Sequence, residues 1–178
     1  MKILKVLGVF VLTLSLGSSV VQDIPSRLKA KLDAAVSSTY DVESFELQEI
    51  SKANLEFEAD PKYDQLHIYK ILEAENLLGY AYLSEANSKK DVFDYVVFYH
   101  TDFSIKKSKI LIYREKYGRQ VGSQRWLKKF NGKTNESNLE YGEDIAAVSG
   151  ATITATAMTD AIKKSLKHMS VLKSKLTD

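Results

Sequence analysis

The sequence contains no cysteine, only 2 prolines and only 3 histidines in 178 residues. The absence of cysteine excludes disulfides, lipid attachment through a cysteine, thiolate catalysis and cysteine-ligated metal. The histidines, His67, His100 and His168, stand far apart and form no H-x-H or H-E-x-x-H pattern, so they do not predict a metal site. We therefore expect neither a metal centre nor a catalytic residue of these types.

The chain also has little net charge. Its formal net charge is +2, and Lys2 and Lys5 lie in an N-terminal segment that need not belong to the folded domain. Without those two residues the positive and negative charges balance. Proteins that bind DNA or RNA need a basic surface to neutralise phosphates. The composition therefore disfavours nucleic acid as a partner.

Residues 1–21 have the pattern of a secretory signal, with a short basic start and an apolar run from Val6 to about Leu16. The same run could instead remain as a short membrane anchor. A buried first strand is disfavoured because Lys2 and Lys5 flank the run closely. Either favoured interpretation predicts an exported protein that faces the periplasm or another extracytoplasmic space. Residues 22–178 are expected to form a single domain, because no repeat or Pro/Gly-rich linker divides them.

The middle of the chain predicts an antiparallel sheet. Its strand candidates are rich in tyrosine, valine, isoleucine and phenylalanine. They are Ser44–Ile50, Leu66–Leu72, Leu77–Ala86, Asp91–Thr101 and Lys107–Glu115. The joins between consecutive candidates are short and polar, which favours antiparallel pairing over parallel crossovers.

Helices are expected on both sides of these strands in the sequence. One follows Pro25, a second is Gly122–Phe130 with Trp126 and Phe130 in the core, and a third runs from Thr154 onward with an apolar stripe. An antiparallel sheet with helices packed against it is an α+β fold.

A segment of small residues, AVSGATITATAM, leads into the third helix. The N-terminus of a helix presents free N–H groups and the positive end of its dipole, which suits an anion such as phosphate. Gly150 and Ala151 keep bulk away, and Ser149, Thr152 and Thr154 offer hydroxyl groups. The alternative is that Thr154 simply caps the helix and the rest is an ordinary turn. These physical arguments leave both interpretations open.

Ser149-Gly150-Ala151-Thr152 resembles the flavinylation motif of the FMN-binding domain family, which is found in the sodium-pumping NADH:quinone reductase and in the Rnf electron-transfer complex. The resemblance implies FMN joined through its phosphate to the hydroxyl of Thr152. It also implies a separate flavin transferase as a partner, which uses FAD as donor together with magnesium.

The resemblance extends upstream. The segment Tyr113–Thr134 is similar to the part of the family in which an acidic residue and a glycine-containing turn lie against the flavin ring. The residues that would occupy these positions are Glu115, Tyr117, Gly118 and Val121. Gly79-Tyr80-Ala81-Tyr82 looks like an earlier strand of the family, so the resemblance covers about Leu77 to Leu166.

The chain departs from the family pattern at two places. Ala146 stands where the family usually has an aspartate three residues before the serine, and Asp144 lies two residues earlier. The turn from Tyr117 to Val121 is closer to family members outside the two named complexes. Membership of either complex is therefore not implied.

The resemblance implies an electron carrier whose redox partner, a membrane electron-transfer complex among the candidates, is unknown. If Glu115 lies near the ring, it should disfavour the anionic reduced flavin. The alternatives are an FMN-dependent reductase of a small molecule and a flavin-free interaction domain of the same fold.

Overall fold

The computed structural model describes residues 24–51 and 66–177. The predicted signal or anchor, residues 1–21, lies outside the described residues. The strands are β1 (Glu46–Glu49), β2 (His67–Glu73), β3 (Asn76–Asn87), β4 (Val92–Tyr99) and β5 (Ile105–Tyr113). The helices are α1 (Ser26–Tyr40), η1 (Arg119–Gly122), α2 (Gln124–Leu127), η2 (Lys128–Phe130) and α3 (Thr152–Thr177).

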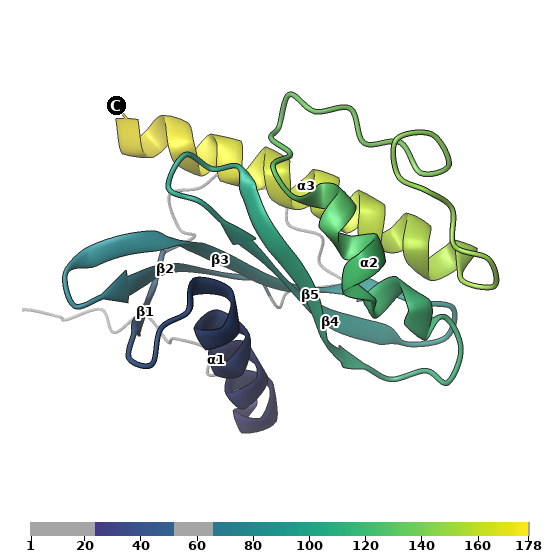
Figure 1. The fold of residues 1–178 in the computed structure, drawn as a ribbon, viewed down its shortest axis with the longest axis horizontal. Helices are drawn as coiled ribbons and strands as arrows, with labels where there is room; N and C mark the ends of the chain where they lie inside the picture. The colour runs from purple at the N-terminus through teal and green to yellow at the C-terminus, as the bar shows by residue number, and fades with distance from the viewer. Residues whose placement is uncertain (1–23, 52–65, 178) are drawn as a thin grey trace, which may run out of the picture.

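The strands form one 5-stranded sheet in the order β1-β2-β3-β4-β5, and every neighbouring pair is antiparallel. Helix α1 covers one face of this sheet, and α2 and α3 cover the other (Figure 1). The predicted α+β fold with an antiparallel sheet is confirmed. Within the described residues, none of the helices combines the length and the apolar composition that crossing a membrane requires.

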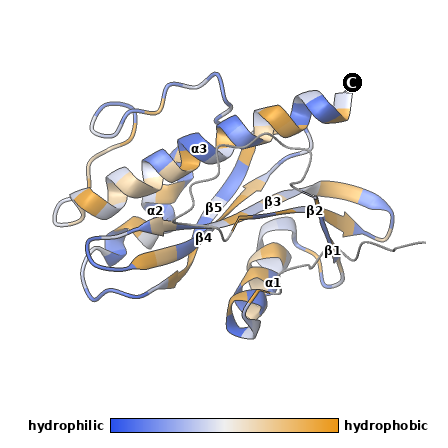
Figure 2. Cartoon of the chain, turned by 180° about the vertical axis from the view of Figure 1, so that it is seen from behind, coloured by the Kyte–Doolittle hydropathy of each residue, from blue (hydrophilic) through white to orange (hydrophobic). Residues whose placement is uncertain are grey.

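Because helices cover both faces, the inner strand β4 is buried along nearly its whole length. Side chains on one face pack with Leu28, Leu32 and Val36 of α1. Side chains on the other face pack with apolar residues of α2 and α3, including Trp126, which is buried as predicted. Hydrophilic and hydrophobic residues alternate along α3, as expected for a helix with one face on a sheet (Figure 2).

Hydroxyl groups of the sheet fix the position of α3. Tyr99 Oη lies 2.6 Å from Ser165 Oγ, and because Ser165 donates to the carbonyl of Ile162, Tyr99 is the donor in this pair. Tyr82 Oη lies 2.9 Å from Nδ1 of His168. The His168 side chain is buried against the sheet. These bonds fix where α3 lies on the sheet, and therefore also where the segment of small residues at its N-terminus lies.

Two of the predicted boundaries that differ from the structure lie close to the candidate site. Helix α3 begins at Thr152, two residues before the predicted start, so Thr154 lies inside the first turn and does not cap the helix. Strand β5 ends at Tyr113 although Lys107–Glu115 was predicted, because Arg114 and Glu115 turn toward the β3–β4 hairpin and bond to it.

Candidate functional site

The candidate site is built on the N-terminus of α3. Gly150 has φ +71°, a left-handed conformation that favours glycine, and the N–H of Ala151 bonds to the carbonyl of Val148 at 3.1 Å. The turn leaves Ser149, Gly150 and Thr152 exposed and Ala151 buried. Thr152 is the first residue of the 26-residue helix. Its hydroxyl therefore faces solvent at the positive end of the helix dipole.

The first N–H groups of α3 are open. Within the described residues, the N–H groups of residues 152–154 form no hydrogen bond, while the N–H of Ala155 already bonds to the carbonyl of Ala151 at 2.9 Å. Such groups are the usual partners of phosphate oxygens at a helix N-terminus. The local geometry therefore suits a phosphate on or beside Thr152.

A second turn, Tyr117–Gly118, lies against this helix end. Tyr113 Oη donates to the carbonyl of Tyr117 at 2.7 Å and lies 3.2 Å from Oγ1 of Thr154. Gly118 has φ +77°, and a Cβ built on it would lie 2.6 Å from the Tyr113 hydroxyl and 3.3 Å from Oγ1 of Thr154. The lack of a side chain at position 118 thus permits the close approach of the turn to α3.

Two large apolar side chains next to these turns in sequence are exposed. Tyr117 is 82% exposed and Ile153 is 54% exposed, and they flank the Gly118 turn and Thr152 in sequence. Each offers an apolar surface that a ligand could contact. Val121, also predicted to contact the cofactor, is fully buried in the core.

Side chains from other elements hold the loop before the motif. Trp126 Nε1 donates to the carbonyl of Ala146 at 2.8 Å, and the N–H of Val148 donates to Tyr141 Oη at 3.0 Å. Asp144 accepts the N–H of Glu140 at 3.1 Å, so its carboxylate has a local structural role. The sequence predicted Trp126 only as a core residue. It did not indicate that the ring nitrogen forms a hydrogen bond with this loop.

The Glu115 carboxylate, which the sequence resemblance places beside the flavin ring, bonds to the β3–β4 hairpin. Its Oε1 accepts the N–H of Lys90 at 2.6 Å, the N–H of Asp91 at 3.1 Å and the hydroxyl of Ser88, all in the β3–β4 hairpin. The Ser88 hydroxyl and then the Lys90 N–H lower the pKa of Glu115 below 4.5. These bonds stabilise the ionised form, so they persist at neutral pH and weaken as the pH falls through that lowered pKa.

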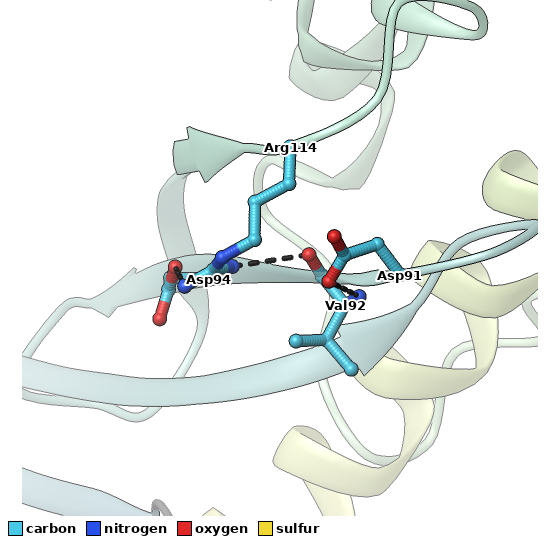
Figure 3. Close-up of polar contacts among 4 residues, drawn as sticks. All are labelled: Asp91, Val92, Asp94 and Arg114. Atoms are coloured by element: carbon cyan, nitrogen blue, oxygen red, sulfur yellow. Dashed lines mark hydrogen bonds and ion pairs between the residues drawn. The ribbon is translucent and has the colours of Figure 1, made fainter.

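The neighbouring Arg114 binds the same hairpin. Its Nη2 lies 2.8 Å from Oδ2 of the buried Asp94, and its Nη1 donates to the carbonyl of Val92 at 3.0 Å. Figure 3 shows the guanidinium between Asp94 and Val92, with Asp91 beside them. The ion pair supplies the positive charge that a buried carboxylate requires.

Glu85 stands directly opposite Asp94 across β3 and β4. Burial, followed by the nearby charge of Asp94, raises the pKa of Glu85 above 4.5. The fold therefore disfavours ionised Glu85, and stability falls as the pH rises through its raised pKa.

Glu85→Gln is accordingly expected to raise the melting temperature at about pH 8, and to have much less effect near pH 4, where Glu85 is protonated. Thermal unfolding at the two pH values measures this difference. The exposed Glu73 on β2 provides the control, since Glu73→Gln should have a small effect at both. A lower melting temperature for Glu85→Gln at pH 8 would contradict the prediction.

The described residues contain no group of three or more His, Asp or Glu side chains arranged to hold a metal ion. His67 instead pairs with Glu49, with Nδ1 and Oε1 2.7 Å apart.

The site is therefore that of a domain with a helix N-terminus open to an anion, near a glycine turn that carries the exposed Tyr117. Residues 89–167 match the family model described as FMN-binding domain. This segment holds β4, β5, the Gly118 turn and the first part of α3, and the match supports a flavin-binding domain of the FMN-binding domain family in this part of the chain. The resemblance found in the sequence is confirmed. A search among curated proteins gave no match.

Proposed function

We propose that this protein carries FMN joined through its phosphate to Thr152 and relays electrons to or from a redox partner outside the cytoplasm. The observation that carries the proposal is the exposed hydroxyl of Thr152 at the open N-terminus of α3, beside the Gly118 turn. When bound, FMN supplies reversible electron transfer, and the protein supplies position and electrostatic environment.

The residues present fit such a group. Residues 152–154 offer free N–H groups to phosphate oxygens. A Cβ built on Gly150 would meet nothing within 4 Å, so there is open space next to the attachment point. Tyr117 and Ile153 offer an exposed apolar surface for a flat ring.

Attachment requires help from another protein. The Oγ1–phosphorus bond to Thr152 would form while the phosphoanhydride bond of FAD breaks and AMP leaves, and the hydroxyl proton must pass to a base. Within the described residues the Thr152 side chain has no hydrogen-bond partner, so no base is placed to accept that proton. A separate flavin transferase that reaches the exposed hydroxyl meets this need.

A covalent bond would keep the flavin with the protein where free FMN is scarce. This agrees with export directed by residues 1–21, which we propose as a cleaved signal or a membrane anchor on the basis of their composition. The redox partner, by the same reasoning, belongs to a membrane-associated electron-transfer chain.

Coexpression with a flavin transferase tests the proposal. The purified protein should be yellow, keep its colour after denaturation and gel filtration, and show the mass of FMN less one water. The added mass should lie on the tryptic peptide 134–163, which contains Thr152 and ends at Lys163. Colour that is lost on denaturation would replace covalent attachment with reversible binding, and a colourless protein would favour a flavin-free interaction domain. Rapid turnover with a small soluble acceptor would favour a reductase.

A further inference from the structure

We propose that Glu115, together with Arg114, is a positioning residue that fastens the Tyr117–Gly118 turn to the β3–β4 hairpin and thereby fixes the wall of the flavin site. The proposal rests on the function proposed above. It differs from the expectation that the Glu115 carboxylate acts directly on the flavin ring.

The two side chains bind the hairpin from consecutive positions. The Glu115 carboxylate accepts hydrogen bonds from the backbone N–H groups of Lys90 and Asp91 and from the hydroxyl of Ser88. A carboxylate that accepts several donors forms strong, charge-assisted bonds. The same oxygen makes all three contacts, so the end of β5 is held at one point of the hairpin.

Arg114 makes a second set of contacts with the hairpin. It pairs with Asp94 at 2.8 Å and donates to the carbonyl of Val92 at 3.0 Å (Figure 3). Just before it, Tyr113 stands opposite Phe93 across β4 and β5, with ring centroids 6.0 Å apart. Three successive residues of the chain therefore bind the same hairpin.

The contacts continue from this anchor to the attachment site. Arg119 Nε donates to the carbonyl of Glu115 at 3.3 Å, which closes the turn between them. Tyr113 Oη then joins the carbonyl of Tyr117 to the Thr154 hydroxyl. A shift of Glu115 would thus move the Tyr117 carbonyl relative to α3. Within the described residues, no contact joins the Glu115 carboxylate to α3 itself.

A positioning role and a direct charge effect predict different results for two variants. Glu115→Gln removes the charge but keeps an acceptor oxygen in place, while Glu115→Ala removes both. A positioning role requires the oxygen, so the alanine variant should be impaired much more than the glutamine variant. A direct effect of charge on the ring would make the two variants alike.

The first measurement needs no flavin. Hydrogen exchange of the Lys90 and Asp91 amides, followed by NMR in the flavin-free protein, should be roughly tenfold faster in Glu115→Ala, the loss of about one charge-assisted hydrogen bond. The amide resonances of Tyr117 and Gly118 should also change their chemical shifts in Glu115→Ala. Glu143→Gln is the control for charge, since Glu143 is exposed and its carboxylate has no hydrogen bond or ion pair within the described residues.

The second measurement uses the FMN-loaded protein. Flavin fluorescence anisotropy should fall in Glu115→Ala and stay near wild type in Glu115→Gln, while the midpoint potential of both should match that of Glu143→Gln. The positioning role would be overturned if both Glu115 variants shifted the midpoint potential equally and left the exchange rates of the Lys90 and Asp91 amides unchanged. If the wild-type protein takes up no FMN, the proposed function fails, but the amide measurement still decides whether Glu115 couples the hairpin to the turn.

Discussion

Thr152→Ala is expected to abolish covalent flavin completely while leaving the fold intact. The substitution removes the oxygen that would join the phosphate, and no other hydroxyl occupies that position at the helix end. Thr152 is exposed, and alanine is a good helix former, so the free energy of unfolding should change by less than about 0.5 kcal/mol. Intact mass after coexpression with a flavin transferase measures the first effect, and thermal unfolding measures the second.

Two further variants make this test specific. Thr156→Ala removes a hydroxyl from the same helix and should keep the full FMN adduct. Thr152→Ser keeps a hydroxyl at the attachment point and should retain part of the adduct. A Thr152→Ala protein that still carries FMN after denaturation would show that another residue holds the flavin, and Ser149 would be the next position to substitute.

Gly79→Ala is expected to destabilise the fold more than any other single change considered. A Cβ at this position, which has φ +155°, would lie 2.1 Å from the carbonyl oxygen of Tyr99 on β4 and 2.6 Å from Tyr40 Oη. The first contact is with backbone, which no side-chain rotation can relieve. We expect a loss on the order of 4 kcal/mol, which is a fall in melting temperature of roughly 10 °C or more in a domain of this size.

The tight space at Gly79 has a structural reason. Tyr40, the last residue of α1, reaches across β3 and donates to the carbonyl of Tyr99 at 2.9 Å. Its hydroxyl is taken out of water, and burial raises the pKa of Tyr40 above its usual value. The bond joins α1 to the sheet at the point where glycine leaves room for it.

Gly122→Ala is the matched control for this prediction. A Cβ on Gly122 would meet only Ile110, at 3.9 Å, which is ordinary van der Waals contact. Its melting temperature should stay close to wild type. The double variant Gly79→Ala with Tyr40→Phe should remain unstable, because the clash with the Tyr99 carbonyl persists. Full recovery in that double variant would show that the tyrosine hydroxyl alone causes the conflict.

Local sequence patterns were enough to predict the class of fold and the position of the motif. Strand segments rich in tyrosine, valine and isoleucine, joined by short polar turns, leave antiparallel pairing as the economical arrangement. The apolar stripe of the last helix is equally local, since it depends only on spacing along the chain. Both could be predicted because neighbouring residues decide them. The SGAT resemblance likewise located the candidate attachment residue, Thr152.

Contacts between residues that are distant in the chain could not be predicted from such patterns. Glu115 and Gly118 are close in sequence, yet Glu115 bonds to the β3–β4 hairpin and Gly118 packs against α3. The local sequence pattern does not indicate which of these two residues contacts the hairpin and which contacts α3, because each contact depends on a partner distant in the chain. His168 is likewise buried because α3 lies across the sheet and meets Tyr82. Local periodicity specifies the elements, whereas the packing of helices on both faces of the sheet specifies the contacts of the site.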